Sequence, residues 1–233
     1  MVDNVLFENI KNIYRKISSA AIRSGRTPFD VRLVAVTKTI GLERIREAID
    51  LGIRVFGENR VQEAQKKIPY CRLHCSDCNV EWHMIGHLQK NKARSAVQLF
   101  DLIHSLDSIG LAEEVNKHAE KDGKIQRVLI EVKLSGEETK HGVAREDLMD
   151  LIEALSVMKN LKLEGLMTIP PFFDDPKMAR PYFRELRELR DKAERSGYRL
   201  PELSMGMTND FEAAILEGAT MVRIGTGIFG ERR

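Results

Sequence analysis

Cysteine is scarce in this sequence, and long apolar runs are absent. The three cysteines, Cys71, Cys75 and Cys78, are too few and too close together to form a disulfide framework. No stretch approaches the roughly 20 apolar residues that a membrane span requires. The N-terminus mixes acidic and basic residues, whereas a signal peptide would place a basic start before an apolar segment. We therefore expect a cytoplasmic protein.

An excess of charge of either sign is also lacking. Lys and Arg together number 37 and Asp and Glu number 35, which gives a formal net charge of +2. Such a balance creates no strong field that would attract nucleic acid or an anionic membrane, so we expect a small-molecule partner. There is no internal repeat, low-complexity tract or linker rich in proline and glycine. We therefore expect residues 1–233 to form a single domain.

What the sequence does contain is a regular alternation of strand and helix patterns. An opening helix, with apolar residues at helical spacing, runs up to Gly25. Eight short apolar segments are then expected as strands: 31–38, 53–57, 81–86, 101–106, 126–134, 163–169, 202–206 and 220–225. Helical stretches are expected near 41–51, 59–67, 89–98, 109–121, 145–158, 177–196 and 210–217. This order predicts an α/β fold, a single (β/α)8 TIM-type barrel with an extra N-terminal helix.

Polar residues follow several of these expected strands, where the active sites of such barrels lie. Lys38 ends the first strand, and glycine turns at Gly206 and Gly225 end the seventh and eighth. The loops after the last two strands of this fold commonly bind phosphate, and Ser204, Thr208 and Thr226 would add hydroxyl groups there. A lysine facing a phosphate site suggests a phosphorylated aldehyde held as a Schiff base, for which pyridoxal 5'-phosphate is the natural candidate.

Several longer motifs support this interpretation together, although a lone TK or GTG would carry no information. They are VAVTKT (34–39), FGENRVQE (56–63), EWHMIGHLQKNK (81–92), KHG (140–142), GLMTIPP (165–171), SMGM (204–207) and MVRIGTGIFG (221–230). With them the chain resembles, over nearly its whole length, the pyridoxal-phosphate-binding homeostasis proteins, relatives of the fold-type III barrel of bacterial alanine racemase. The resemblance implies a Schiff base on Lys38 and a cofactor site formed by Lys38, Asn59, Ser204, Gly206, Met207, Arg223, Gly225 and Thr226. In it Arg223 would face the pyridine nitrogen.

The resemblance implies a carrier or regulator in vitamin B6 and amino-acid homeostasis, without an established catalytic turnover. An arginine cannot give the ring nitrogen the proton that a carboxylic acid would supply, which weakens the ring as an electron sink. The similar racemases also take a second acid from an additional C-terminal domain, whereas this chain ends at Arg233. We expect a monomer, with apo forms of pyridoxal-phosphate enzymes as conceivable recipients. A weak amino-acid racemase using the same cofactor is the alternative.

A different class of function remains open at the cysteines. Their spacing matches the three-cysteine iron–sulfur loop of radical S-adenosylmethionine enzymes, and with His74 they would also suit a zinc site. The simplest interpretation is a loop without a metal, and we assign no metal-binding residue. His83, inside an expected strand, is predicted to be a hydrogen-bonded core histidine, and Glu58 to pair with Arg60 or with a loop backbone.

Overall fold

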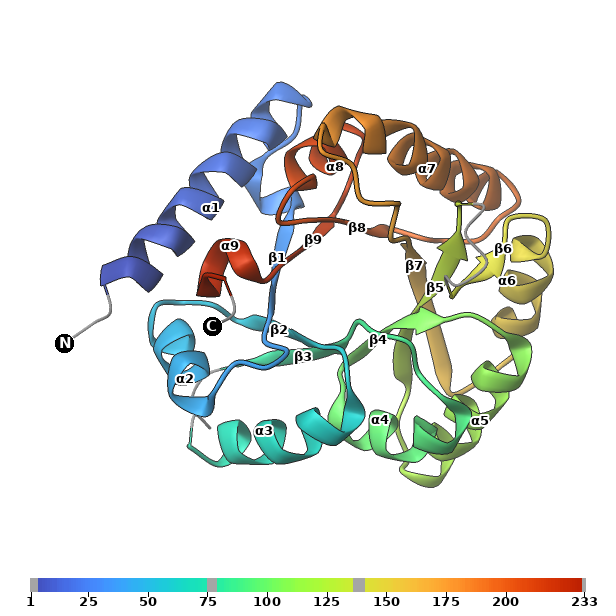
Figure 1. Ribbon diagram of the computed structural model, residues 1–233. Helices are drawn as coiled ribbons and strands as arrows, with labels where there is room; N and C mark the ends of the chain where they lie inside the picture. The colour runs from blue at the N-terminus through green and yellow to red at the C-terminus, as the bar shows by residue number, and fades with distance from the viewer. Residues whose placement is uncertain (1–3, 75–78, 136–140, 232–233) are drawn as a thin grey trace.

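The computed structural model describes residues 4–74, 79–135 and 141–231. Its centre is a closed barrel of eight parallel strands, which Figure 1 shows nearly end-on. The barrel strands are β1 Arg32–Val36, β2 Val55–Glu58, β3 Glu81–Met84, β4 Leu102–Leu106, β5 Gln126–Lys133, β7 Leu161–Met167, β8 Glu202–Met207 and β9 Met221–Ile224. Each strand pairs with the next in this order, and β9 pairs with β1 to close the barrel. A two-residue strand, β6 Val143–Ala144, pairs with the end of β5.

The helices form a ring outside the barrel (Figure 1). They are α1 Asn4–Arg23, α2 Leu42–Asp50, α3 Val61–His74, α4 Ala93–Leu99, α5 Ile109–Lys121, α6 Leu148–Ser156, α7 Arg180–Arg195, α8 Phe211–Leu216 and the short α9 Thr226–Phe229. The first helix packs beside the last, where the Asn9 side chain donates a hydrogen bond to the Ile228 carbonyl at 3.0 Å. Within the described part of the chain, no helix has the length and apolar character to cross a membrane.

The predicted barrel and its opening helix are confirmed, and the differences are local. Helix α3 continues past the predicted end at 67, through Pro69, to His74. Proline disfavours helix in the residue before it, but here Ile68 and Cys71 are buried in the core, and this packing outweighs the local preference. The stretch near 89–98 divides into a 3-10 turn, Lys90–Lys92, followed by α4. Strand β6 was not predicted, since two residues are too short to show a periodic pattern.

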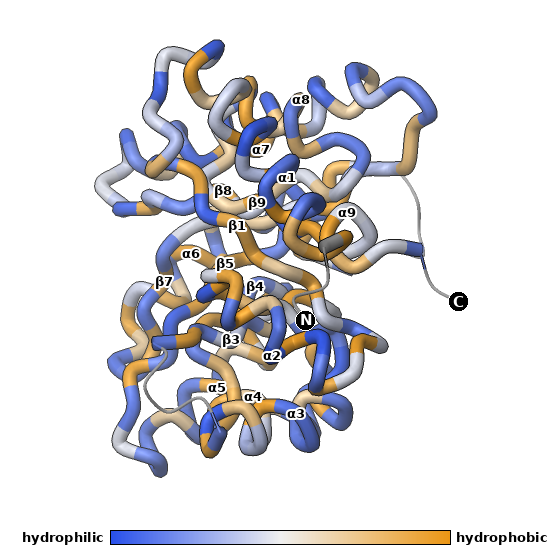
Figure 2. Tube along the Cα trace, turned by 90° about the vertical axis from the view of Figure 1, so that its left-hand side faces the viewer, coloured by the Kyte–Doolittle hydropathy of each residue, from blue (hydrophilic) through white to orange (hydrophobic). Residues whose placement is uncertain are grey.

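The apolar residues form two cores. The larger lies between the strands and the helices, and the smaller fills the barrel with residues such as Val34, Leu102, Leu129 and Met221. The strand segments at the centre of the molecule are mostly apolar (Figure 2). The barrel interior departs from the usual layers of Val, Ile and Leu, because polar side chains are buried among these residues. They include His83, His104, Ser204 and Arg223.

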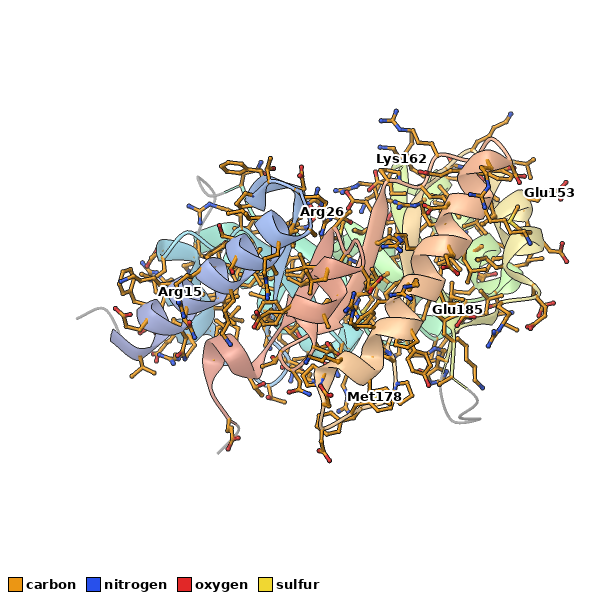
Figure 3. All side chains as sticks on the ribbon, turned by 90° about the horizontal axis from the view of Figure 1, so that it is seen from above. Arg15, Arg26, Glu153, Lys162, Met178 and Glu185 are labelled. Atoms are coloured by element: carbon orange, nitrogen blue, oxygen red, sulfur yellow. The ribbon has the colours of Figure 1, made fainter. Side chains whose placement is uncertain are left out.

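The two ends of the barrel differ in character. Lys162, near the start of β7, and Met178, in the segment after β7, lie at opposite ends of the molecule (Figure 3). The N-terminal end holds ion pairs, in which Arg127 contacts Glu164 at 2.9 Å and Glu81 at 3.3 Å, and Arg32 contacts Glu202 at 3.5 Å. The C-terminal ends of the parallel strands meet at the other end, where the candidate site lies.

Candidate functional site

A cavity of about 470 Å³ opens at the C-terminal mouth of the barrel. Its wall includes six of the residues that the sequence predicted for the site: Lys38, Asn59, Met207, Arg223, Gly225 and Thr226. The remaining lining residues are Val36, Ile85, Gly86, Ile169, Phe172, Thr208 and Asn209. Residues from six of the strands, or from the segments that follow them, therefore converge on one cavity.

Lys38 lies in the turn after β1, and a buried polar network holds this turn. The Thr37 hydroxyl donates to Glu58 Oε1 at 2.6 Å, and Lys67 Nζ donates to the Thr37 carbonyl at 2.6 Å and to Glu58 Oε1 at 2.9 Å. Burial raises the pKa of Glu58, and the hydrogen bonds from Thr37 and Lys67 offset part of this effect. The ion pair of Glu58 is thus with Lys67 of α3, where the sequence had suggested Arg60.

The residue after Lys38 has an unusual backbone conformation. Thr39 has a φ of +65°, in the left-handed region that a β-branched residue rarely adopts. Its amide donates to Glu63 Oε1 at 2.6 Å, and Lys67 also contacts this carboxylate, which ties the strained turn to α3. Such strain persists only where the surroundings hold it, and it is often found beside functional residues. Here it sets the direction in which the chain leaves Lys38.

A pair of threonine hydroxyls also lies at the cavity. The Thr226 hydroxyl is 3.2 Å from that of Thr208, which also accepts a hydrogen bond from the Gly227 amide at 3.4 Å. The two residues come from the turns after β9 and β8, and both line the cavity. The sequence named Thr208 as a hydroxyl for the phosphate loops, although the cofactor site implied by the family resemblance did not include it.

The structure places Ser204 and Gly206 away from the cavity wall. The Ser204 side chain is fully buried in the barrel, where it bonds to His104 Nδ1 at 2.9 Å and to an Arg223 amino group at 2.6 Å. Gly206 has a φ of +92°, and a Cβ atom there would lie 2.6 Å from the Ala214 side chain. Its contribution is therefore the shape of the turn that leads to Thr208.

Arg223 is the cation of the site. It is 3% exposed, and its two amino groups donate to Ser204 Oγ at 2.6 Å and to the Thr168 carbonyl at 2.9 Å. Burial lowers the pKa of Arg223 to about 10, an effect that the charges of Glu131 and Asp210 oppose. The guanidinium therefore keeps its charge at neutral pH, and the contacts with β8 and with the residue directly after β7 fix its orientation.

Glu131 of β5 lines a neighbouring cavity of about 190 Å³, which shares Ile85, Gly86 and Ile169 with the larger one. Burial raises the pKa of Glu131 to about 7, and the charge of Arg223 opposes this effect. The native state thus binds a proton between pH 4.5 and 7 that the unfolded state has lost, so Glu131 makes the protein less stable as the pH rises through this window.

We therefore expect Glu131→Gln to raise the free energy of unfolding at pH 8, by at most about 3 kcal/mol, and to have little effect near pH 4.5. Urea unfolding at both pH values measures the difference. Glu113→Gln, at an exposed position of α5, is the control and should behave alike at the two pH values. An equal effect of Glu131→Gln at pH 8 and pH 4.5 would contradict the prediction.

His83 is the hydrogen-bonded core histidine that the sequence predicted. It is fully buried, and its ring nitrogens lie 3.1 Å from a Glu81 carboxylate oxygen and 3.0 Å from His104 Nε2. The sequence analysis did not identify His104, which is as deeply buried and connects His83 to Ser204. The sequence signal for His104 was the adjacent pair His104–Ser105 inside an otherwise apolar strand.

A cluster of possible metal ligands lies at the barrel mouth. His87, Asp107 and His141 each place one ligand atom within 4.8 Å of the others. However, the two imidazole rings stack face to face, with centroids 3.6 Å apart and planes 9° from parallel. A ring nitrogen directs its lone pair in the ring plane, so two stacked rings cannot bind one ion without turning. We assign no metal site to these residues.

The structure describes only part of the cysteine motif. Cys71 lies in α3 and packs in the hydrophobic core, with 5% of its surface exposed. Cys75 and Cys78 lie outside the described residues. His74, the conceivable fourth ligand, contacts the Tyr70 carbonyl through Nδ1 at 2.8 Å.

Comparison with known proteins places this barrel in a family. The sequence profile of the alanine racemase N-terminal domain matches residues 8–233. A curated relative from Aquifex aeolicus, named pyridoxal phosphate homeostasis protein, is 48% identical over 97% of this chain and 98% of its own length. A relative of the same name from Escherichia coli K12 is 39% identical over 98% of this chain and 97% of its own. This chain belongs to the pyridoxal phosphate homeostasis protein family.

Solved structures agree with this assignment. PipY of Synechococcus elongatus PCC7942, solved with PLP bound, superposes with a TM-score of 0.81 at 38% identity and covers 94% of this chain and 100% of its own. A protein of unknown function from Bifidobacterium adolescentis superposes with a TM-score of 0.92 at 36% identity, over 98% of both chains. Alanine racemase of Clostridium difficile, at 17% identity and a TM-score of 0.74, shares the fold with 57% of its chain covered. The expected family and the fold-type III barrel are thereby confirmed.

Proposed function

We propose that this chain binds pyridoxal 5'-phosphate at the barrel mouth as a Schiff base on Lys38 and acts as a cytoplasmic, monomeric carrier of the cofactor. The observation that carries the proposal is that Lys38, Arg223 and the pair Thr208–Thr226 line one cavity. The family membership and the PLP bound to PipY support it. Apo forms of pyridoxal-phosphate enzymes are the proposed recipients of the cofactor.

The residues of the cavity fit this group. Its volume of about 470 Å³ lies in the range of small-molecule sites. The Asn59 side-chain oxygen is buried without a hydrogen-bond partner, so this acceptor can receive a hydrogen bond from a ligand donor such as the phenolic hydroxyl of the cofactor. The ligand therefore has an amine, a cation, a polar amide and a hydroxyl pair available at separate parts of one wall.

Each of these groups then has a defined task. Lys38 supplies the amine that condenses with the aldehyde, and its position in the strained, α3-anchored turn aims it into the cavity. The hydroxyls of Thr208 and Thr226 would hold the phosphate, together with backbone amides of the turn that begins at Gly225. The guanidinium of Arg223, which also lines the cavity, would supply a donor for the pyridine nitrogen.

Arg223 also favours a carrier over an enzyme. Bound pyridoxal phosphate supplies an electron-withdrawing ring, and this effect is strongest when the ring nitrogen is protonated. A guanidinium holds only donors, so it stabilises the nitrogen as an acceptor and keeps the proton off it. In addition, none of the four tyrosines, which all lie among the described residues, is part of the cavity wall. A second acid of the kind that racemases use is therefore not supplied by tyrosine within this cavity.

The phosphate contacts provide the test. Thr208→Val combined with Thr226→Val keeps the shape of the wall but removes both hydroxyls. We expect the dissociation constant of pyridoxal phosphate to rise by at least about tenfold, since each hydrogen bond to a charged group contributes about 1.5–3 kcal/mol. The affinity for unphosphorylated pyridoxal should change little. Titration followed by absorbance measures both ligands.

The matched control is Thr27→Val, at a turn outside the cavity, and it should leave both affinities unchanged. Equal losses for pyridoxal and pyridoxal phosphate in the double variant would contradict the assigned phosphate site. Failure of the unsubstituted protein to bind pyridoxal phosphate saturably would refute the proposed function.

A further inference from the structure

An unbroken line of hydrogen bonds crosses the barrel interior from its N-terminal end to the cavity. Glu81 Oε2 lies 3.1 Å from His83 Nε2, and His83 Nδ1 lies 3.0 Å from His104 Nε2. His104 Nδ1 lies 2.9 Å from Ser204 Oγ, which accepts from Arg223 at 2.6 Å. The three central side chains are fully buried, whereas the Glu81 side chain is 38% exposed. We call these five residues the interior chain.

The chemistry of its ends determines where each proton of the interior chain lies. A carboxylate only accepts, so His83 must carry its proton on Nε2 towards Glu81, and a neutral His83 then accepts at Nδ1. His104 must therefore donate from Nε2 and accept at Nδ1, where the Ser204 hydroxyl donates. Arg223 only donates, which agrees with the lone pair that Ser204 offers it. The Glu81 carboxylate thus sets the direction of every link, and the bond from Arg223 is compatible with it.

The surroundings favour the neutral histidines that this assignment needs. Burial lowers the pKa of both His83 and His104. The pKa of Glu81 is lowered to about 2, mainly by the hydrogen bond from His83 and then by the charge of Arg127.

The charged groups near the Glu81 end come from several strands. They are Arg32 of β1, Arg127 of β5, Glu164 of β7 and Glu202 of β8. At the other end, Glu131 and Asp210 act on Arg223.

We propose that His83 and His104 are positioning residues whose fixed tautomers link the carboxylate of Glu81 to Ser204 and so hold Arg223 in the orientation that it presents to the cavity. Arg223 has its other fixed contact at the Thr168 carbonyl, directly after β7, and two fixed contacts hold the planar guanidinium in one orientation. The effect on the cofactor rests on the proposed function above. The assignment of the two histidine tautomers does not depend on the proposed function.

The first test uses the protein without cofactor. Long-range ¹H–¹⁵N spectra of histidine-labelled protein should show both rings as the neutral form protonated at Nε2, with no titration between pH 8 and pH 6. The signals are assigned by comparison with His83→Asn and His104→Asn. An Nδ1-protonated or doubly protonated ring at neutral pH would overturn the proposal.

Glu81→Gln gives a readout that simple core packing would not produce. A glutamine amide can donate as well as accept, so His83 is no longer forced into one tautomer. We expect a mixture of tautomers at His104, which lies two links from the substitution. Glu114→Gln, at another partly exposed carboxylate that contacts a histidine, His118, is the control and should leave the His104 signals unchanged. An unchanged His104 in Glu81→Gln would also overturn the proposal.

The second test measures coupling through Ser204. His83→Asn should raise the dissociation constant of pyridoxal phosphate about tenfold in the natural background, and should have no further effect in Ser204→Ala, because the link is already broken there. Additive effects would show that His83 does not act through Ser204. If the unsubstituted protein does not bind pyridoxal phosphate, the proposed function fails, and the tautomer measurements alone decide on the interior chain.

Discussion

Replacing Lys38 with alanine should abolish covalent attachment of pyridoxal phosphate and leave the barrel folded. Lys38 lies after the last residue of β1, in a turn that is held by the buried hydrogen bond of Thr37 to Glu58 and by the exposed one from the Thr39 amide to Glu63. The substitution therefore removes the amine nitrogen that would form the proposed Schiff base, and it leaves the core packing unchanged. Borohydride reduction followed by peptide mass spectrometry should find the pyridoxyl group on Lys38 in the natural protein and no adduct in the variant.

The control for this prediction is Lys133→Ala. Lys133 lines the smaller cavity of about 190 Å³, so it is a second amine close to the barrel mouth. The variant should keep the full adduct on Lys38. An adduct on Lys133 in the natural protein, or unfolding of Lys38→Ala under conditions in which the natural protein is folded, would show that the cofactor lysine has been misassigned or that Lys38 is structural.

The largest effect on stability is expected from Gly165→Ala in β7. Gly165 pairs with Glu202 of β8, and a Cβ atom at this position would lie 1.9 Å from the Glu202 carbonyl oxygen. Backbone cannot move aside as a flexible side chain can, so the strands must separate at this point of the closed barrel. We expect a loss of at least about 3 kcal/mol in the free energy of unfolding, measured by urea titration.

Gly41→Ala is the matched control, because nothing lies within 4 Å of the added Cβ and the backbone has an ordinary φ. It should change the free energy of unfolding by less than about 1 kcal/mol. A Gly165→Ala protein as stable as this control would mean that β7 and β8 do not pair in the register described.

The sequence was sufficient for the fold because the barrel depends on local patterns. Short apolar segments alternate with amphipathic stretches, and this order leads to parallel strands with helical crossovers. Lys38, Asn59 and Arg223 could be placed at the mouth by the same argument, since each lies at the C-terminal end of a strand or directly after it. Periodicity carries this information without any knowledge of distant contacts.

Periodicity could not predict which side chains far apart in the sequence contact each other. Ser204 looked like a phosphate ligand because it opens the SMGM motif, yet its partner is His104, 100 residues away. The inward or outward direction of a strand residue depends on register, and β8 contains an irregularity between Ser204 and Met207 that shifts it. Thr208 lies beyond this irregularity and reaches the cavity. The SMGM motif thus lies beside the cavity, with Met207 on its wall and Ser204 buried in the barrel interior.

The anchoring of the Lys38 turn to α3 limits how this barrel mouth can diversify. The turn is joined to the neighbouring helix through Glu63 and Lys67, so an insertion or deletion between β1 and α2 would break contacts that belong to a different βα unit. The length of the turn is therefore constrained by contacts with both βα units. New shapes at the mouth are more easily accommodated after β7, where residues 168–175 run without regular secondary structure and include Phe172, 78% exposed on the cavity rim.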